Sequence, residues 1–573
     1  MPWRDGRPIG ICRVILAFFA LTCIGFAQNY TAPGNPQVGS QNTVTANAPV
    51  PRPNTTPCVV QLFSNLDFDD FNPKFFTYTP PADCPGPWSA VVLNADWSID
   101  AGRQFDRTAE IWIGAANVYF GTTAEPSHTV ARSWHIESNL TDYSPLFTTM
   151  QSGRVDLGNL VNNTYTSVIH GSAYIQYYPL AQGQKAPRTA DVVLPMSASS
   201  NGGTVTLNTT SDQLVGTWRT PILPTNIEGA YLDVFSQSQS GDEFWYTCAP
   251  NDVATELQNC GGTGFREAQV SIDGTPAGVA PVYPWIYTGG IDPYLWRPIP
   301  GVHTLNFEPY RVDLTPFAGV LSNGQQQHTV AVNVFNANGY FSETATLLLY
   351  RDSGSSQVTG AVTQNTIGQP NPTVREKLKV TNTDVSGKVT VQSNRGFTVE
   401  GWAQTSHGTV DTQINESIDF RNTQDYYVKN DGSVLDQSVD QRTNVSERVI
   451  TKDSNHNVAV RVKQLTWPLK LTYDLTLNPD GSFTQNTTLG QKLNRLLLNT
   501  WNGWPVYYSA YSDAVSPTDN LAVSAQGVVT TTNQANREDY SYNDSTGACW
   551  NETVKAEAGA LTKVSGGSCQ GKH

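Results

Sequence analysis

The chain is poor in charged residues, and bases are the scarcer kind. Only 15% of its 573 residues are Asp, Glu, Lys or Arg, against about 25% in an average soluble domain. The 49 acidic residues outnumber the 35 Lys and Arg residues, so the formal net charge is −14. This charge would repel a nucleic acid or an anionic lipid surface, and we expect neither as a partner.

The common catalytic signature motifs are also missing. The sequence contains no nucleophile elbow, P-loop, HExxH motif or dinucleotide-binding fingerprint. Eight His residues in the whole chain give a Ser-His-Asp system little support. The cysteines lack CxxC spacing and have no His pair near them in the sequence, as a zinc site would need. We expect no metal and no other cofactor.

Long apolar runs are absent after the N-terminus. Residues 14–26 form an apolar run behind three arginines, with Gly25 and Ala27 at positions that suit signal-peptide cleavage. The run is too short to span a bilayer but has the length of a signal-peptide core. We expect residues 1–27 to be a signal peptide and the mature chain to be secreted or periplasmic, without a membrane span. A short membrane anchor is the alternative.

Six cysteines remain after this segment, and they fall into three close pairs. An even number of cysteines in an exported chain is typical of disulfides, although the sequence allows many connectivities. Local pairing is the simplest arrangement. It joins Cys58 with Cys84, Cys248 with Cys260, and Cys549 with Cys569.

The rest of the chain has the composition and sequence pattern of an all-β protein. It contains 46 Gly, 35 Pro and only 3 Met, and 10% of its residues are aromatic. Short β-branched and aromatic runs alternate with polar residues, which predicts half-buried strands packed as β-sandwiches. Clear examples lie at 108–120, 166–177, 229–235 and 329–335, whereas Leu489–Trp501 has the pattern of a short helix.

Composition also predicts the domain boundaries. Residues 28–57 are rich in Pro, Asn and Thr and are expected to be a linker. Two β-sandwiches follow, at 58–225 and 226–352. A second polar, Gly- and Pro-bearing stretch then leads to a C-terminal β-rich module at 377–573. Its strands are plain and carry few clustered acids, as in a supporting module.

Carboxylates in aromatic surroundings are the candidates for chemistry. Asp106 stands between Phe105 and Arg107 at a predicted strand start, where an acid with a neighbouring guanidinium can activate water. Glu137 lies on a strand with Trp134. The alternatives are a turn-capping Asp and an exposed strand Glu.

Two more segments have the same character. Residues 241–246 place two acids beside three aromatic residues on a loop closed by Cys248, a pattern that suits the face of a sugar. Residues 283–299 are aromatic and Gly-bearing and include Arg297, which can clamp a carbonyl or hydroxyl group. Packed loops between two sandwiches would look the same.

Taken in order, several of these segments resemble a known family. They are CVVQLFSNLDF, FDRTAEIWIG, DEFWY, FREAQVSIDG, IYTGGIDPYLWRPI and YRVDLTPF. They resemble the peptide-N-glycanase A type amidases, the peptide-N4-(N-acetyl-β-glucosaminyl)asparagine amidases of plants, fungi and acidophilic bacteria. The resemblance covers roughly residues 58–350. It implies two packed jelly-roll domains with the site between them, as in the related peptide-N-glycanase F type.

The resemblance also implies a reaction. These amidases cleave the amide bond between Asn and the first N-acetylglucosamine of N-glycosylated peptides and glycoproteins. An intact glycan is released as a glycosylamine, and Asn becomes Asp. The family implies activity at acidic pH and tolerance of core α1,3-fucose. The reaction requires no metal, and we expect the enzyme to be a monomer.

The family's motifs give roles to individual residues. Asp106 matches the acid of an aromatic-Asp-Arg triplet and is expected to activate water or attack directly. Glu243 is expected to be the second acid and Glu137 the third. The expected substrate contacts are Arg107, Trp134, Trp245, Trp296 and Arg297.

Two other functions fit the same residues. An endo-β-N-acetylglucosaminidase would use two of these carboxylates and leave one sugar on Asn. A secreted glycan-binding β-sandwich would use only the aromatic rings, but such a protein does not need acids in every aromatic segment.

Overall fold

The computed structural model describes residues 37–569, and these form an all-β fold. The described residues contain 29 strands in five sheets, several short 3-10 helices and one α-helix, α1 (Ala318–Leu321). This confirms the predicted fold class. None of the helices in the described range is long and apolar enough to cross a membrane. The expected signal peptide, residues 1–27, lies outside the described residues.

The first β-sandwich consists of two four-stranded sheets around one core. Its buried side chains include Trp97 and Tyr177 from one sheet and Ile111 and Val155 from the other. One sheet has the order β1 (Cys58–Phe68), β8 (Ile169–Pro179), β3 (Trp88–Ile99), β6 (Arg132–Asn139). The other has the order β2 (Lys74–Tyr78), β7 (Gln151–Asp156), β4 (Thr108–Ile113), β5 (Ala116–Thr122), and the 3-10 helix η1 (Thr141–Thr148) precedes β7.

The second β-sandwich is built in the same way from a five-stranded and a four-stranded sheet. The larger sheet contains β10 (Val205–Leu207), β17 (Tyr340–Arg351), β12 (Ile227–Gln239) and β15 (Tyr310–Asp313), with β9 (Val192–Met196) also paired to β17. The smaller one contains β11 (Leu214–Trp218), β16 (His328–Phe335), β13 (Glu267–Ile272) and β14 (Thr275–Pro281). Strands β9 to β11 precede residue 226, so the expected boundary does not coincide with the sheets. Their partners lie more than a hundred residues further along the chain, beyond the reach of a local pattern.

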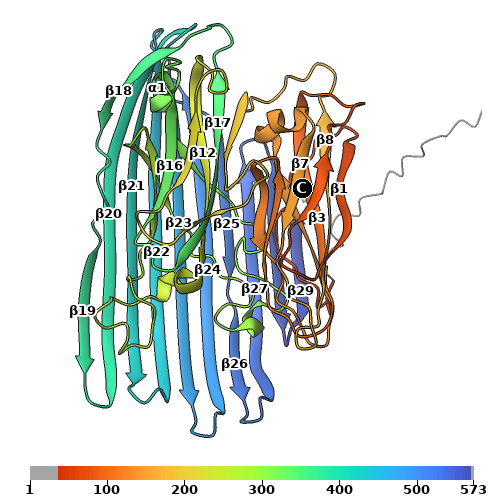
Figure 1. The fold of residues 1–573 in the computed structure, drawn as a ribbon, viewed down its shortest axis with the longest axis vertical. Coiled ribbons are helices and arrows are strands. Elements are labelled where there is room, and N and C mark those ends of the chain that lie inside the picture. The colour runs from red at the N-terminus through yellow and green to blue at the C-terminus, as the bar shows by residue number, and fades with distance from the viewer. Residues whose placement is uncertain (1–36, 570–573) are drawn as a thin grey trace, which may run out of the picture. The chain divides into compact units, whose positions relative to one another are not determined.

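The C-terminal part is one antiparallel sheet of twelve strands, many of which are about twenty residues long (Figure 1). It starts before residue 377, because two strands lie in the polar stretch expected to separate the modules. The strands are β18 (Thr359–Asn365), β19 (Thr373–Val380), β20 (Asp384–Thr405), β21 (Gly408–Lys429), β22 (Val434–Asp453), β23 (Val458–Leu477), β24 (Phe483–Trp501), β25 (Trp504–Val515), β26 (Thr518–Val523), β27 (Val529–Asp544), β28 (Cys549–Glu557) and β29 (Ala560–Ser568).

The helix expected at Leu489–Trp501 is wrong, because these residues belong to β24. Leu489, Gln491 and Leu493 are buried at alternate positions, as in a strand with one face against a core. The clustered leucines have a helix-like spacing. Pairing with β23 on one side and β25 on the other overrides that local preference.

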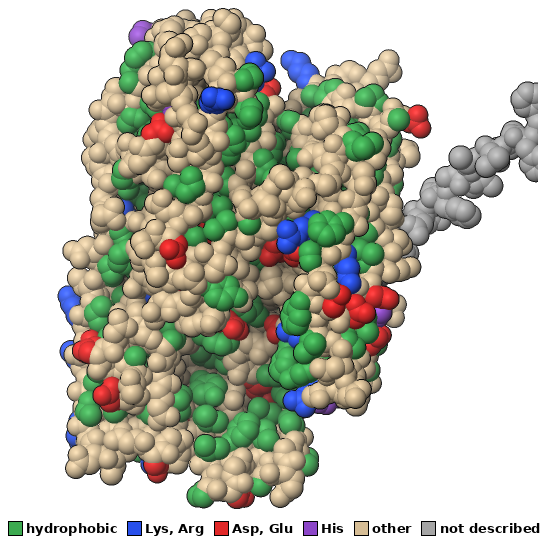
Figure 2. Space-filling view, viewed as in Figure 1, with side chains coloured by type: hydrophobic (Ala, Val, Ile, Leu, Met, Phe, Trp, Pro, Cys, Tyr) green, Lys and Arg blue, Asp and Glu red, His purple; other side chains and the backbone are tan. Residues whose placement is uncertain are grey.

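One hydrophobic core joins the large sheet to the second sandwich. Phe265 packs on Phe420 of β21 with ring centroids 5.0 Å apart, and Tyr283 packs on Trp467 of β23 at 5.3 Å. The opposite face of the large sheet carries mostly polar side chains. Figure 2 shows that charged side chains are sparse on the visible face and gather mainly over the first sandwich and along its border with the second.

Residues 37–57, expected to be a linker, are an extended segment that packs along the protein and that we call the N-terminal strap. Gly39 donates its N–H to the carbonyl of Leu561 in β29. Further along, Ala46 donates to Glu538, and Arg52 forms an ion pair with Glu137 of β6. The strap thus contacts both the large sheet and the first sandwich.

The three disulfides pair as expected from the sequence. They join Cys58 with Cys84, Cys248 with Cys260, and Cys549 with Cys569, at sequence separations of 26, 12 and 20. Each therefore closes a short loop. The second one lies within the loop that follows β12, which is part of the site described below.

Several carboxyl groups are buried within the sheets. Glu110 of β4 is 6% exposed and accepts a hydrogen bond from Trp112. Burial, followed by the nearby charge of Asp156, raises the pKa of Glu110 to about 8. In the large sheet, burial raises the pKa of Asp513 to about 7, and burial and then the charge of Asp513 raise the pKa of Glu538. Such groups are protonated in the folded protein under conditions in which the unfolded chain ionises them.

This predicts that the contribution of these groups to stability falls as pH rises from about 4 to about 8, because each binds a proton in the folded state that it loses in the unfolded state. Each such group lowers the free energy of unfolding by about 1.4 kcal/mol per pH unit within that window. The Glu110→Gln variant should show a shallower slope by about this amount in urea unfolding at several pH values. The exposed Glu557→Gln variant is the matched control. Equal slopes in the two variants would contradict the prediction.

Candidate active site

Asp106 lies where the first sandwich meets a loop of the second. It stands in the segment between β3 and β4, and its Oδ2 accepts a hydrogen bond from the N–H of Gly289 at 2.9 Å. Gly289 belongs to residues 282–309, between β14 and β15, which we call the Gly289 loop. Thr288 anchors this loop by donating its hydroxyl to the carbonyl of Thr123 at 2.7 Å. Burial raises the pKa of Asp106, while the Gly289 N–H and the charge of Arg107 oppose the increase.

Glu125, in the segment between β5 and β6, is a second acid at this position. A Cβ atom added to Gly289 would lie 2.5 Å from Asp106 Oδ1 and 2.9 Å from Glu125 Oε2, so both carboxyl groups converge on this glycine. No larger residue fits there without displacing one of them. Burial, and then the charge of Asp106, raises the pKa of Glu125 to about 8.

Two arginines complete this side of the site. Arg297 Nη2 lies 3.5 Å from Glu125 Oε1, and Arg132, 4% exposed, interacts electrostatically with both. Glu125 Oε2, Arg132 Nε and Nη1, and Arg297 Nε are buried without a hydrogen-bond partner among the described residues. Buried polar atoms are nearly always satisfied in folded proteins. Four such atoms in one cluster are typical of a place that receives a polar ligand or water.

Glu243 is the third acid and comes from residues 240–266 between β12 and β13, which we call the Glu243 loop. This loop begins with two short 3-10 helices, η2 (Ser240–Asp242) and η3 (Trp245–Thr247). Burial, and then the charge of Asp106, raises the pKa of Glu243 to about 7. The three acids therefore come from three separate segments, and each Glu is affected by the charge of Asp106.

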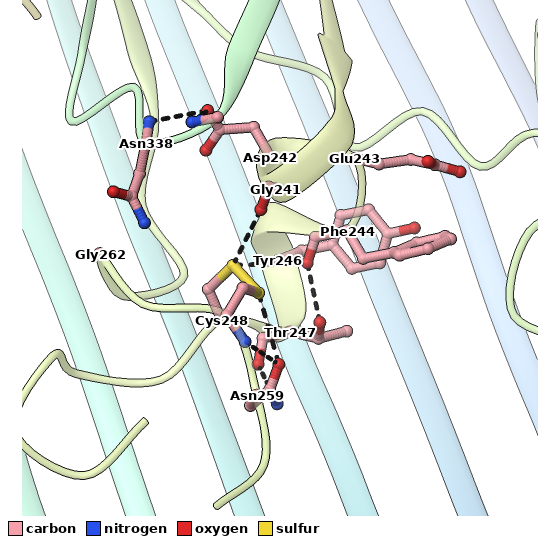
Figure 3. The surroundings of a disulfide bond; sticks show 12 residues. Gly241, Asp242, Glu243, Phe244, Tyr246, Thr247, Cys248, Asn259, Gly262 and Asn338 are labelled. Atoms are coloured by element: carbon pink, nitrogen blue, oxygen red, sulfur yellow. Dashed lines mark hydrogen bonds between the residues drawn. A yellow bond between two sulfur atoms is a disulfide. The ribbon is translucent and has the colours of Figure 1, made fainter. Parts of the chain in front are cut away.

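The Glu243 loop is held by a buried ion pair and a disulfide. Asp242 and Arg266 are both fully buried and lie 2.7 Å apart. Asp242 also accepts N–H bonds from Asn338 and Gly339. In Figure 3, Asp242 points toward Asn338, while Glu243 extends to the opposite side of the loop. A loop fixed in this way holds Glu243 in one direction.

Aromatic rings border the acids. Phe105 is 50% exposed and contacts the ring of Tyr165, with centroids 5.5 Å apart. Arg107 lies over Phe105 at 5.8 Å, and Arg297 lies over Tyr294 at 4.4 Å. Exposed rings next to carboxyl groups can pack against the faces of sugars.

The structure therefore brings together four of the residues predicted from the sequence and places the other four elsewhere. Asp106, Arg107, Glu243 and Arg297 lie at the site. Glu137 lies on the outer face of β6, bound to Arg52 at 2.6 Å. It is five residues from Arg132 along that strand, roughly 17 Å away at about 3.3 Å per residue.

The three tryptophans expected to contact substrate are buried. Trp134 is in the core of the first sandwich, and Trp245 is fully buried against Phe420. Trp296 is 1% exposed and donates its Nε1–H to the carbonyl of Gly290 at 2.9 Å. Trp296 is thus a buried residue of the Gly289 loop that stabilises it through a hydrogen bond within the loop.

Glu125 and Arg132 were not predicted. The sequence around Glu125, TTAEPSH, has no aromatic neighbour, so a search for acids in aromatic surroundings passes over it. The available signal was its position directly after a fully buried strand and before a proline. The ends of strands are common positions for site residues.

One group of side chains elsewhere has the composition of a metal site. Glu228, Asp352 and His407 offer ligand atoms that lie within 4.8 Å of one another. Asp352 already accepts hydrogen bonds from Ser406 and from the N–H of Gly354. The group is explained as an anchor between the second sandwich and the turn that follows β20.

Comparison with known proteins shows the family of this chain. The profile of the family "Peptide N-acetyl-beta-D-glucosaminyl asparaginase amidase A" matches residues 48–367. A curated relative, peptide-N4-(N-acetyl-beta-glucosaminyl)asparagine amidase A from Prunus dulcis, is 30% identical over 466 residues, which cover 76% of this chain and 77% of that protein.

Solved structures are more distant. PNGase F from Flavobacterium meningosepticum is 13% identical, with a TM-score of 0.34, and the match covers 52% of this chain and 97% of that one. PNGF-II is 10% identical, with a TM-score of 0.35; the match covers 52% of this chain and 66% of that one, just under two thirds of its length. These values are too low to transfer residues.

The family match spans more than half of the chain and encloses Asp106, Glu125 and Glu243. The almond relative extends the similarity over three quarters of it. The chain is an amidohydrolase and belongs to the peptide N-acetyl-β-D-glucosaminyl asparaginase amidase A family.

Proposed function

We propose that the enzyme hydrolyses the amide bond between Asn and the innermost N-acetylglucosamine of N-glycosylated peptides and proteins. The observation that carries this proposal is the convergence of Asp106 and Glu125 on Gly289, with Glu243 close enough to be affected by the charge of Asp106. The name of the almond relative supports the substrate class. The products are an Asp-containing peptide and an intact glycan, first released as its glycosylamine.

Asp106 is the acid suited to act as the base. Burial raises its pKa, and the Gly289 N–H and the charge of Arg107 stabilise its ionised form against that effect; once ionised, Asp106 can take a proton from water. The water oxygen then bonds to the amide carbon of Asn. Arg297, which has a buried Nε without a partner, is placed to stabilise charge on the amide oxygen.

Glu125 and Glu243 are suited to act as acids. Their pKa values of about 8 and about 7 keep both protonated at acidic pH. One of them donates a proton to the amide nitrogen as the carbon–nitrogen bond breaks, and the leaving group departs as a neutral glycosylamine. One ionised and one protonated carboxyl group acting together is a common solution for acid–base catalysis.

These protonation states support an acidic working range. Activity falls as pH rises through about 7, because the proton donor ionises. We also propose that the enzyme works outside the cytoplasm, and the three disulfides support an oxidising compartment. Acceptance of core α1,3-fucose is a further part of the proposal and rests on the family resemblance.

The first prediction concerns the product. After incubation of a defined N-glycopeptide with the enzyme at acidic pH in heavy-oxygen water, mass spectrometry should show the free peptide with Asp in place of Asn and one heavy oxygen. A peptide that keeps one N-acetylglucosamine would establish a glycosidase instead. A glycopeptide that binds but stays intact would leave only a binding function. Matched glycopeptides with and without core α1,3-fucose test the fucose proposal.

The second prediction concerns the base. Asp106→Asn should lower kcat by about 10²–10⁴-fold, because Asn keeps the hydrogen bond from Gly289 but cannot accept the proton. Asp83→Asn, an exposed change in the same sandwich, is the control. Circular dichroism and thermal unfolding check that both variants are folded. Near-normal activity of Asp106→Asn would remove Asp106 from its role.

The third prediction compares Glu125, found at the site, with Glu137, which was expected from the sequence to be the third acid. Glu125→Gln should lower kcat by about 10²-fold or more, because Glu125 lies beside Asp106 and Gly289. Glu137→Gln should keep most of the activity, because Glu137 binds the N-terminal strap through Arg52. The reverse result would restore Glu137 as the third acid. Glu243→Gln, measured alongside, should show a loss similar to that of Glu125→Gln.

A further inference from the structure

The inner face of the large C-terminal sheet carries amide side chains that bind the Gly289 loop. Gln491 of β24 donates to the carbonyl of Pro284 at 2.8 Å and accepts from the N–H of Val302 at 3.0 Å. It therefore binds one residue in the first part of the loop and one in its last part. Asn536 of β27 binds the middle by donating to the carbonyls of Leu295 and Ile299, at 2.9 and 2.8 Å. Gln485 and Gln534 add bonds to the carbonyls of Ile291 and Tyr294.

A second set of amides binds the Glu243 loop. Asn422 donates to the carbonyl of Tyr246 at 2.8 Å, Gln424 to that of Cys248 at 3.1 Å, and Gln437 to that of Thr247 at 2.9 Å. The three also bond to one another, at 2.7 Å between Gln437 and Gln424 and at 2.8 Å between Gln424 and Asn422. They lie on the neighbouring strands β21 and β22, directly beneath the loop drawn in Figure 3.

These side chains form a set that we call the amide row. Its members are 7% exposed or less, except for Gln534, which is half-buried, and each binds main-chain atoms of a site loop. They are Asn422, Gln424, Gln437, Gln485, Gln491, Gln534 and Asn536.

Packing alone does not require amides at these positions. The surrounding contacts are hydrophobic, and burying an amide is costly unless its hydrogen bonds are made. Apolar side chains would fill the space but would leave the loop carbonyls without donors. An amide also fixes the position of the loop relative to the sheet, because hydrogen bonds need a defined direction and distance.

The two loops bound by the amide row are the loops that the second sandwich contributes to the site. The Gly289 loop supplies the N–H bonded to Asp106 and carries Arg297, and the Glu243 loop carries the third acid. We infer that the C-terminal sheet is a positioning part of the active site, in which the amide row sets Gly289 and Glu243 in place around Asp106. The family match ends at residue 367, before any member of the row. The inference rests on the proposed function, because its effect is read in that reaction.

The test uses Gln491→Met in the full chain, with Asn486→Met on the outer face of the same strand as control. Methionine has nearly the shape of glutamine but cannot make either hydrogen bond. We expect kcat to fall about tenfold with little change in KM, because the acids are misplaced while substrate contacts remain. The acidic limb of the pH profile of kcat should move to higher pH, because a weaker Gly289 N–H bond stabilises ionised Asp106 less. Loss of folded protein alone would lower the apparent kcat without moving this limb.

Gln491→Glu provides a conservative rescue. When protonated, the introduced carboxyl group keeps one acceptor and one donor, so it can bind both Val302 and Pro284; when ionised, it loses the donor. We expect Gln491→Glu to approach wild-type kcat at the lowest pH tested and to fall toward Gln491→Met as pH rises. The same low activity at every pH would contradict this. If Gln491→Met does not fold, Gln534→Met, at a half-buried position, takes its place.

A second measurement does not depend on activity. Hydrogen exchange followed by mass spectrometry should show faster exchange in peptides from residues 284–302 in Gln491→Met than in Asn486→Met. An unchanged pH limb together with unchanged exchange would overturn the inference. If the wild-type enzyme released no glycan, the proposed function would fail, while exchange would still decide whether the amide row holds the loop.

Discussion

The hydrogen bond from the Gly289 N–H to Asp106 is the interaction on which the site depends. It joins a segment of the first sandwich to a loop of the second. A side chain at position 289 would collide with the carboxyl groups of Asp106 and Glu125. Thr288 strengthens this junction by bonding to the carbonyl of Thr123. Because neither sandwich holds the three acids alone, the chemistry belongs to the interface between them.

Burial gives the acids different roles at this interface. Carboxyl groups removed from water resist ionisation, so each Glu here has a raised pKa, and the charge of Asp106 raises both further. Asp106 accepts the Gly289 N–H and lies beside Arg107, and both oppose the increase in its pKa that burial causes. Arg132 and Arg297 keep unsatisfied polar atoms facing the same region. The amide group of the proposed substrate can supply hydrogen-bond partners to these buried polar atoms.

Local sequence predicted what depends on local chemistry. Alternating strands gave the all-β class, and acids next to aromatic residues led to Asp106 and Glu243. The same criterion failed for Glu125, which has no aromatic neighbour in the sequence and acquires its surroundings only through folding. It also selected Trp134, Trp245 and Trp296, whose rings are buried; aromatic residues near a site often support its walls. The pairing of β9 with β17 depends on a partner far along the chain, and Leu489–Trp501 becomes a strand by pairing with the neighbouring strands β23 and β25. Neither could be read from the local pattern.

The contact between the N-terminal strap and the last strand bears on how the chain matures. Ser40 accepts an N–H bond from Leu561, and Ala46 binds Glu538, 492 residues further along. Residues 39–46 therefore gain these partners only after Glu538 and Leu561 have been synthesised, whereas Arg52 of the same strap binds Glu137 of the first sandwich. Closing so long a loop is slow, and it follows the pairing of neighbouring strands. Until residues 39–46 are in place, Glu538 lacks the hydrogen bond from Ala46, so we expect this part of the strap to become ordered at a late step of folding.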